Sequence, residues 1–196
     1  MVLSLLALAV APGFAIVFYI YWKDRYDREP LKNLFICFFL GMLSIISAID
    51  IQNWLQPTLK HYFPNNTISF FSLFAFIVVS LSEELVKFVM LRFYAYPHKS
   101  FDEPFDGITY SVMVGMGFAT LENIEYVFNY GFATGVLRMF LSVPAHATFA
   151  VLIALYAATT VRDPMARRVK ALNDRREQLK AGIVASTNKR KKLTNK

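Results

Sequence analysis

Residues 68–91 read ISFFSLFAFIVVSLSEELVKFVML, an apolar run interrupted by two adjacent glutamates and a lysine. The run is long enough to cross the hydrocarbon core of a bilayer, because a spanning helix needs about 20 residues. A charged side chain near the middle of such a helix costs about 2.5–3.5 kcal/mol on insertion scales, so it must face a protein interior or water. This stretch predicts a membrane-spanning helix whose charges line a buried polar site.

The composition of the whole chain also indicates a membrane protein. The 196 residues are 56% hydrophobic and 18% charged, and they include 19 Phe and 10 Tyr. Soluble proteins average about 45–50% apolar and about 25% charged residues, so a water-soluble enzyme is not expected. The aromatic content argues against a disordered chain. A single cysteine, Cys37, gives no disulfide framework and no thiolate metal cluster.

The apolar segments predict an all-α, polytopic transmembrane bundle of about five helices. The first segment has no basic start of the kind found in signal peptides, so it is expected to be a retained span. Lys and Arg alternate in number from loop to loop, and the positive-inside rule then places the N-terminus outside and the C-terminus in the cytoplasm. The five segments are Val2–Trp22, Leu31–Ile49, Ile68–Tyr96, Gly107–Tyr130 and Gly135–Val161.

The chain divides into a transmembrane bundle, residues 1–161, and a basic cytoplasmic tail, residues 162–196. The tail carries 12 Lys and Arg against 3 Asp and Glu, within a total net charge of +7. This pattern predicts a basic amphipathic helix that lies on the cytoplasmic leaflet and binds anionic lipid. No nucleic-acid-recognition motif accompanies the charges, so no nucleic acid partner is expected. The apolar face of the helix would comprise Met165, Val169, Leu172, Leu179 and Ile183.

The charges of the third segment can be placed by helical geometry. Glu83 and Lys87 are four residues apart, so they share a face and can pair, while Glu84 is rotated by about 100° and points elsewhere. One carboxylate would then be held ionised by the lysine, and the other would be available as a general base. The alternative is that both glutamates lie near the cytoplasmic end of a shorter span and are solvated.

The next two segments also carry polar groups near their middle, Glu122 with Asn123 and then His146. An acid beside an amide can bind a metal, orient a water or donate to an oxyanion, although a lone helical histidine is more often structural. A packed bundle would bring these groups and the two glutamates into one pocket. Such a pocket could hold zinc or activate water without a metal.

These residues resemble the motifs of a known family. Residues 83–87, EELVK, resemble an EExxK motif, residues 117–123, GFATLEN, resemble GFAxxEN, and His146 resembles the histidine that follows in the PrsW family of intramembrane proteases. Residues 102–110, DEPFDGITY, are similar to the segment that precedes the family's EN helix. The resemblance covers roughly residues 74–156. It extends to the related CAAX prenyl endopeptidases and bacteriocin-processing membrane proteases.

The resemblance implies a hydrolase that cleaves a peptide bond in or near the membrane segment of a membrane-anchored regulator, such as an anti-sigma factor, in a prokaryotic cytoplasmic membrane. It implies that Glu83 and Glu84 act as base and bind water, with Lys87 in support, and that Asn123 stabilises the oxyanion. It further implies that Glu122 and His146 support the site or bind metal. The candidate ligands of a zinc ion are His146, Glu84 and Glu122, and a metal-free glutamate mechanism is the alternative.

Two non-enzymatic interpretations compete with the protease. One is an ion- or proton-coupled transporter, which the buried carboxylates and His146 would suit, although no internal repeat supports it. The other is an inactive scaffold of the same fold. Family members generally continue into further membrane helices with another histidine, whereas the sequence after residue 161 is polar and basic.

Overall fold

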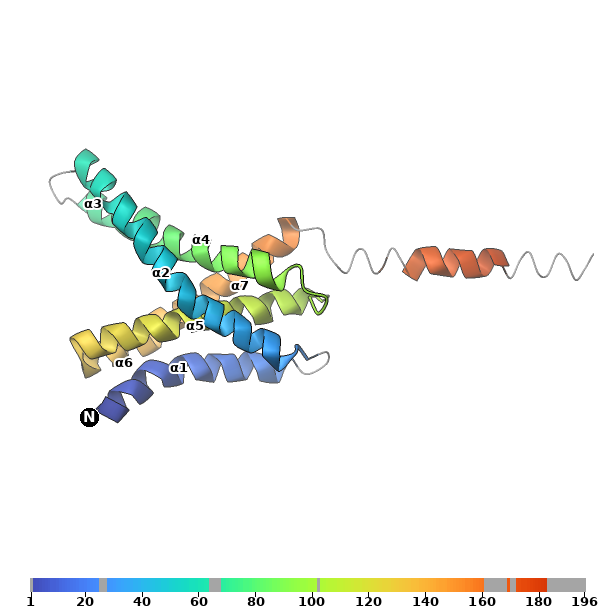
Figure 1. The fold of residues 1–196 in the computed structure, drawn as a ribbon, viewed down its shortest axis with the longest axis horizontal. Coiled ribbons are helices and arrows are strands. Elements are labelled where there is room, and N and C mark those ends of the chain that lie inside the picture. Colours follow the sequence, from blue (N-terminus) through green and yellow to red (C-terminus); the bar gives the residue numbers. More distant parts are fainter. Residues whose placement is uncertain are drawn as a thin grey trace, which may run out of the picture.

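The computed structural model describes residues 2–24, 28–63, 68–101, 103–160, 169 and 172–182. These residues are largely helical and contain no strand, so the all-α prediction is confirmed. Figure 1 shows α1 to α7 as one bundle, with the end of α2 and α3 reaching beyond the other elements of the bundle at the upper left. The elements are α1 (Val2–Lys23), α2 (Leu31–Tyr62), α3 (Ile68–Leu73), the π-helical η1 (Phe74–Ser80), α4 (Leu81–Met90), the π-helical η2 (Leu91–Ala95), α5 (Pro104–Tyr130), α6 (Phe132–Phe140) and α7 (Ser142–Thr160).

The helices follow the predicted apolar segments, with one clear difference in length. The second predicted segment ends at Ile49, but α2 continues to Tyr62. Pro57 lies inside α2 and does not end it. Elements α3 to η2 follow one another without a gap, and only Leu141 separates α6 from α7. Within the part of the chain that the structure describes, three helical stretches are long and apolar enough to cross a membrane, namely Val2–Lys23, Leu31–Tyr62 and Phe132–Tyr156.

The bundle buries a set of polar side chains within its apolar core and exposes large apolar side chains on its surface. Lys87 and Asn123 are 4% and 2% exposed, whereas Phe76 and Phe93 on the outer surface are 74% and 77% exposed. Such a distribution is costly in water, where large apolar patches are covered, and is the one expected of helices surrounded by lipid tails. It places the chemistry-bearing residues at the centre of the bundle.

Helix α5 lies at that centre and contacts α1, α2, α4, α6 and α7. It crosses α2 closely, because a Cβ atom on Gly41 would overlap the Val114 carbonyl and one on Gly117 would overlap the Phe38 carbonyl. Small residues at such crossings let helix backbones approach in membranes. The absence of two Cβ atoms therefore sets how deeply the second half of α5 enters the bundle.

Both ends of α5 are defined by local chemistry. Its start has Pro104 in the first turn, where no amide hydrogen is needed, and the N–H of Glu103 donates to Asp106 Oδ2 at 2.6 Å. Its end is Gly131, whose φ of 86° lies in the left-handed region that favours glycine. The chain reverses there, so that α6 and α7 run back along α5.

A group of polar side chains joins the α1–α2 loop to the start of α5, and we call it the junction network. Tyr110 donates to Glu29, and the Tyr110 hydroxyl lies 2.8 Å from Ser100 Oγ. Asn33 Nδ2 donates to Ser100 Oγ at 3.2 Å. Burial raises the pKa of Glu29 from 4.5 to about 7, against the opposing effect of the Tyr110 hydrogen bond. The network comprises Glu29, Asn33, Ser100 and Tyr110.

Part of the predicted amphipathic tail helix lies within the described residues. Residues 172–182 are helical, and all of them are exposed, including Leu172 and Leu179. Met165 and Ile183, which complete the predicted apolar face, lie outside the described residues. The lipid contact of this helix stays a prediction.

Candidate active site

The glutamate pair and its lysine lie on α4, between the two π-helical segments. Lys87 Nζ is 2.7 Å from Glu84 Oε1 and 3.7 Å from Glu83 Oε2. The prediction that Lys87 pairs with Glu83 while Glu84 points elsewhere is therefore wrong in its second half. Positions three apart on a helix are neighbours as much as positions four apart, and here the closer contact is the one at three. The two carboxylates share one ammonium group.

Glu122 and Asn123 lie on α5, where an arginine from α6 contacts both. Arg138 Nη2 is 2.7 Å from Glu122 Oε2, and Arg138 Nε donates to Asn123 Oδ1 at 2.7 Å. The guanidinium group also lies over the Tyr126 ring, 4.2 Å from its centroid. Asn123 Nδ2 donates in turn to the main-chain oxygen of Ala9 at 3.3 Å. Three side chains of α5 are thus contacted by one planar cation.

His146, from the first turns of α7, connects these two sets of residues. Its Nδ1 atom is 2.9 Å from Lys87 Nζ, and its Nε2 atom is 2.9 Å from Glu122 Oε2. The residue is 9% exposed, and its ring lies 5.7 Å from the Phe118 ring, measured between the centroids. All residues predicted for the site therefore meet in one place. We call this group the polar cluster, and it comprises Glu83, Glu84, Lys87, Glu122, Asn123, Arg138 and His146.

Arg138 is the member of the polar cluster that was not among the site residues predicted from the sequence. It lies inside the predicted fifth segment, Gly135–Val161, where it is the only basic residue before Arg162. A lone arginine inside an apolar segment must find a partner away from lipid, which is the same argument that singled out Glu83 and Glu84. Its position inside an apolar segment therefore predicts Arg138 as a site residue as well.

Three side chains of the polar cluster present atoms of the kind that bind metals. One oxygen each from Glu83 and Glu122 and one nitrogen of His146 lie within 4.8 Å of one another. The ligands predicted from the sequence were His146, Glu84 and Glu122, but Glu84 is turned toward Lys87 and Glu83 stands in its place. Two carboxylates and an imidazole are a donor set that zinc accepts.

The arrangement of these donors does not fit a metal ion as it stands. An ammonium group can only donate hydrogen bonds, so Nδ1 of His146 must accept from Lys87. The proton of the neutral imidazole then lies on Nε2, which donates to Glu122. Both ring nitrogens are engaged, and Glu122 Oε2 also accepts from Arg138. The imidazole has no free lone pair for a metal.

The sequence of the chain matches a known protein family. A sequence model described as "PrsW family intramembrane metalloprotease" matches residues 29–186. The chain belongs to the PrsW family. Relatives named Protease PrsW are 39% identical over 153 residues in Geobacillus kaustophilus, 37% identical over 153 residues in Bacillus subtilis and 36% identical over 162 residues in Clostridioides difficile. No solved structure matches the chain significantly.

The matches to PrsW proteins cover most of this chain but only part of its relatives. The alignment with the Geobacillus kaustophilus protein covers 78% of this chain and 65% of that protein, and the Bacillus subtilis alignment covers 78% and 67%. The family model begins at residue 29, so it includes the polar cluster and leaves out α1. Membership in a membrane protease family agrees with the apolar helices.

Two larger cavities reach the polar cluster of this PrsW family member from different sides. One, of about 270 Å³, is lined partly by Glu83, Glu122 and Glu125 and lies between α2, α4 and α5. The other, of about 350 Å³, lies between α4 and α7, and Glu84 is its one charged lining residue. Its remaining walls are apolar, formed by Leu81, Leu85, Phe88, Phe149, Leu152, Ile153 and Tyr156. The site therefore has a polar approach and an apolar approach.

Proposed function

We propose that the chain is an intramembrane endopeptidase that hydrolyses a peptide bond in or near the membrane segment of another protein. The observation that carries this proposal is the convergence of three glutamates and His146 at the centre of an apolar bundle. Burying so many ionisable groups among membrane helices is costly, and proteins keep such groups where they do chemistry. Membership in the PrsW family gives the reaction class.

Glu84 is the base in this proposal. Its Oε1 atom is held by Lys87, while its Oε2 atom is buried and has no hydrogen-bond partner among the described residues. Oε2 accepts a proton from water as the water oxygen attacks the carbonyl carbon of the substrate. When the carbon–nitrogen bond breaks, the same carboxyl returns the proton to the leaving nitrogen. General base catalysis of this kind contributes about 10²–10⁴-fold.

The other residues of the polar cluster hold this base and the forming charges. Glu83 and Glu122 line the polar cavity, which suits the approach of water. Asn123 orients Arg138, and one hydrogen of its Nδ2 group is left for the oxyanion role that the family resemblance assigns to it, because the contact with Ala9 uses only the other.

The apolar cavity supports a membrane-anchored substrate. It lies between α4 and α7 and Glu84 is one of its lining residues, so an apolar segment entering between these helices would meet the proposed base. We propose a multi-pass topology of five spans with the N-terminus outside, in a prokaryotic cytoplasmic membrane, with residues 162–196 on anionic lipid headgroups. A single-span regulator of the anti-sigma-factor type is the proposed substrate class.

A proton-coupled carrier is the second candidate, because the contacts Glu84–Lys87–His146–Glu122 form an unbroken chain through the bundle. Such chains relay protons in membrane transporters. A carrier would show no peptide cleavage, and proton uptake into proteoliposomes would depend on His146.

The test is cleavage of tagged single-span membrane proteins co-expressed with the chain. We expect products with the wild type and with Glu177→Gln, which changes an exposed glutamate far from the polar cluster. Glu84→Gln should lower cleavage by at least about 10²-fold, because an amide cannot accept the proton. His146→Ala should also lose activity. Full activity of Glu84→Gln in a folded protein would exclude Glu84 as the base, and no cleavage by the wild type would reject the protease.

A further inference from the structure

The ammonium group of Lys87 is enclosed by the members of the polar cluster that lie on one side of His146. It is within 2.7 Å of Glu84 Oε1, 2.9 Å of His146 Nδ1 and 3.7 Å of Glu83 Oε2. It also lies over the ring of Phe118, 4.1 Å from the centroid. The side chain is 4% exposed. Two carboxylates, an imidazole nitrogen and an aromatic face thus surround one cation.

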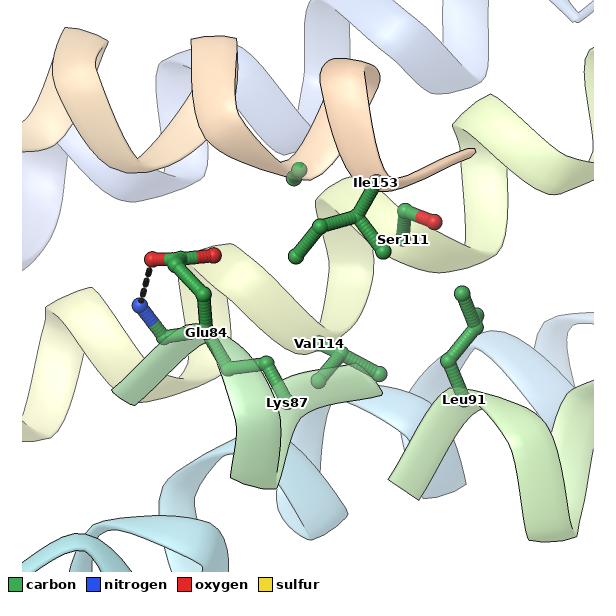
Figure 2. A pocket seen from close by; sticks show the side chains of 7 residues that line it. Glu84, Lys87, Leu91, Ser111, Val114 and Ile153 are labelled. Atoms are coloured by element: carbon green, nitrogen blue, oxygen red, sulfur yellow. Dashed lines mark hydrogen bonds and ion pairs between the residues drawn. The ribbon is translucent and has the colours of Figure 1, made fainter. Parts of the chain in front are cut away.

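The surroundings of Lys87 leave it no other partner of opposite charge among the described residues. Figure 2 shows the contact between Lys87 and Glu84 beside a cavity of about 10 Å³, whose other labelled walls are Leu91, Val114, Ile153 and the hydroxyl of Ser111. That volume suits no more than about one water molecule. A buried ammonium group needs compensating partners, and here Glu83 and His146, two of the three residues that could bind a metal, supply them together with Glu84.

A second cation, Arg138, completes the pattern on the opposite side of His146. It occupies Glu122 Oε2, the oxygen that also accepts the Nε2 proton of the imidazole. The three carboxylates of Glu83, Glu84 and Glu122 therefore face two fixed positive charges. A divalent ion added among these groups would lie beside both cations and would have to displace at least one of them.

We propose that Lys87 is the resident cation of this site and takes the place that a metal ion would occupy, so that the chain works without a bound metal. In its catalytic part the proposal rests on the protease function given above. Lys87 acts as a positioning residue. It holds the carboxylate of Glu84 with Oε2 free, and it fixes the imidazole of His146 with its proton toward Glu122.

Metal binding by the purified full chain tests this inference without any substrate. The wild type is exposed to Zn²⁺ or Co²⁺, desalted, and assayed for metal content and for the visible absorption of bound Co²⁺. We expect no retained metal in the wild type. We expect Lys87→Ala to retain about one ion per chain, because the change frees Nδ1 of His146 and leaves Glu83 and Glu84 uncompensated. Lys87→Ala/His146→Ala should again retain none.

Lys87→Arg is the matched control, because it keeps a cation in the cluster and should retain no metal. About one ion in the wild type, lost with His146→Ala, would overturn the proposal. A folded Lys87→Ala protein without metal would overturn it too. If Lys87→Ala does not fold, the wild type and Lys87→Arg decide.

Cleavage with and without a metal chelator separates this inference from the proposed function. Unchanged wild-type cleavage in chelator is expected, and loss of cleavage that added metal restores would contradict the inference alone. If the wild type cleaves nothing, the protease proposal fails and the metal content still decides the role of Lys87.

Discussion

At the scale of single residues, Arg138 shows how much of the polar cluster depends on shape as well as charge. Its guanidinium group contacts Glu122 through Nη2 and Asn123 through Nε while it stacks on Tyr126. A planar fork can make both contacts at once, whereas a lysine offers a single charged point. The identity of the residue at 138, and not only its charge, should therefore matter.

We expect Arg138→Met to lower the free energy of unfolding by about 3 kcal/mol, because it leaves Glu122 buried without its cation. Arg138→Lys keeps the charge, but its compact ammonium group cannot reproduce the planar contact with Glu122 and Asn123 and the face over Tyr126, so it should lose about half as much. Unfolding of the purified variants in detergent, followed by helical content, measures both. Equal stability of the wild type and Arg138→Met would show that Glu122 does not depend on this pair.

At the scale of helices, the crossing of α2 and α5 determines where the motif residues meet. Gly117 belongs to the stretch that also carries Glu122 and Asn123, and it lies against the Phe38 carbonyl. A side chain there would push α5 away from α2. Helix α5 carries Glu122 and Asn123 of the polar cluster, so the displacement would reach the cluster.

We expect Gly117→Ala to lower the free energy of unfolding by about 1–3 kcal/mol, the usual cost of overpacking. It should also lower cleavage. Gly107→Ala is the matched change on the same helix, because a Cβ there would lie at an ordinary 3.5 Å from the Phe101 ring. That variant should be as stable as the wild type or slightly more stable. Thermal unfolding of the two variants side by side makes the comparison, and equal losses would refute a special role for the crossing.

The helices and the motif residues could be predicted from the sequence because both depend on residues that are close together along the chain. Apolar segments give the helices, and charges inside them give Glu83, Glu84, Glu122 and His146. Contacts between helices were not predictable in the same way. Whether Lys87 turns to Glu83 or to Glu84, and whether Arg138 reaches α5, depends on the α2–α5 crossing and on the reversal at Gly131, which no spacing within one helix encodes.

At the scale of the whole molecule, the junction network couples the α1–α2 loop to α5 and makes stability depend on pH. The pKa of Glu29 is raised to about 7 in the folded protein, chiefly by burial, and the nearby charge of Asp106 adds to this. The folded protein therefore binds the Glu29 proton more tightly than the unfolded chain. This contribution to stability is complete below about pH 4.5 and is lost as pH rises through about 7.

We expect the midpoint temperature of thermal unfolding to decrease when the pH is raised from 5 to 8. Glu29→Gln should make this decrease smaller, since a neutral amide neither binds nor releases a proton on unfolding. Scans of both proteins in the same detergent at the two pH values measure the difference. An identical fall in the two proteins would mean that Glu29 titrates alike when folded and unfolded.

The contact between Asn123 and Ala9 determines which substitutions α1 tolerates at this point. Asn123 is held by the carbonyl oxygen of Ala9, which is a main-chain atom. Every residue type carries that acceptor, so a substitution at position 9 that still fits against α5 leaves the acceptor in place. Helix α1 lies outside the matched family region. Helix α1 therefore braces the buried amide of Asn123 through its backbone, and the side chain at position 9 needs only to be small enough to keep that approach.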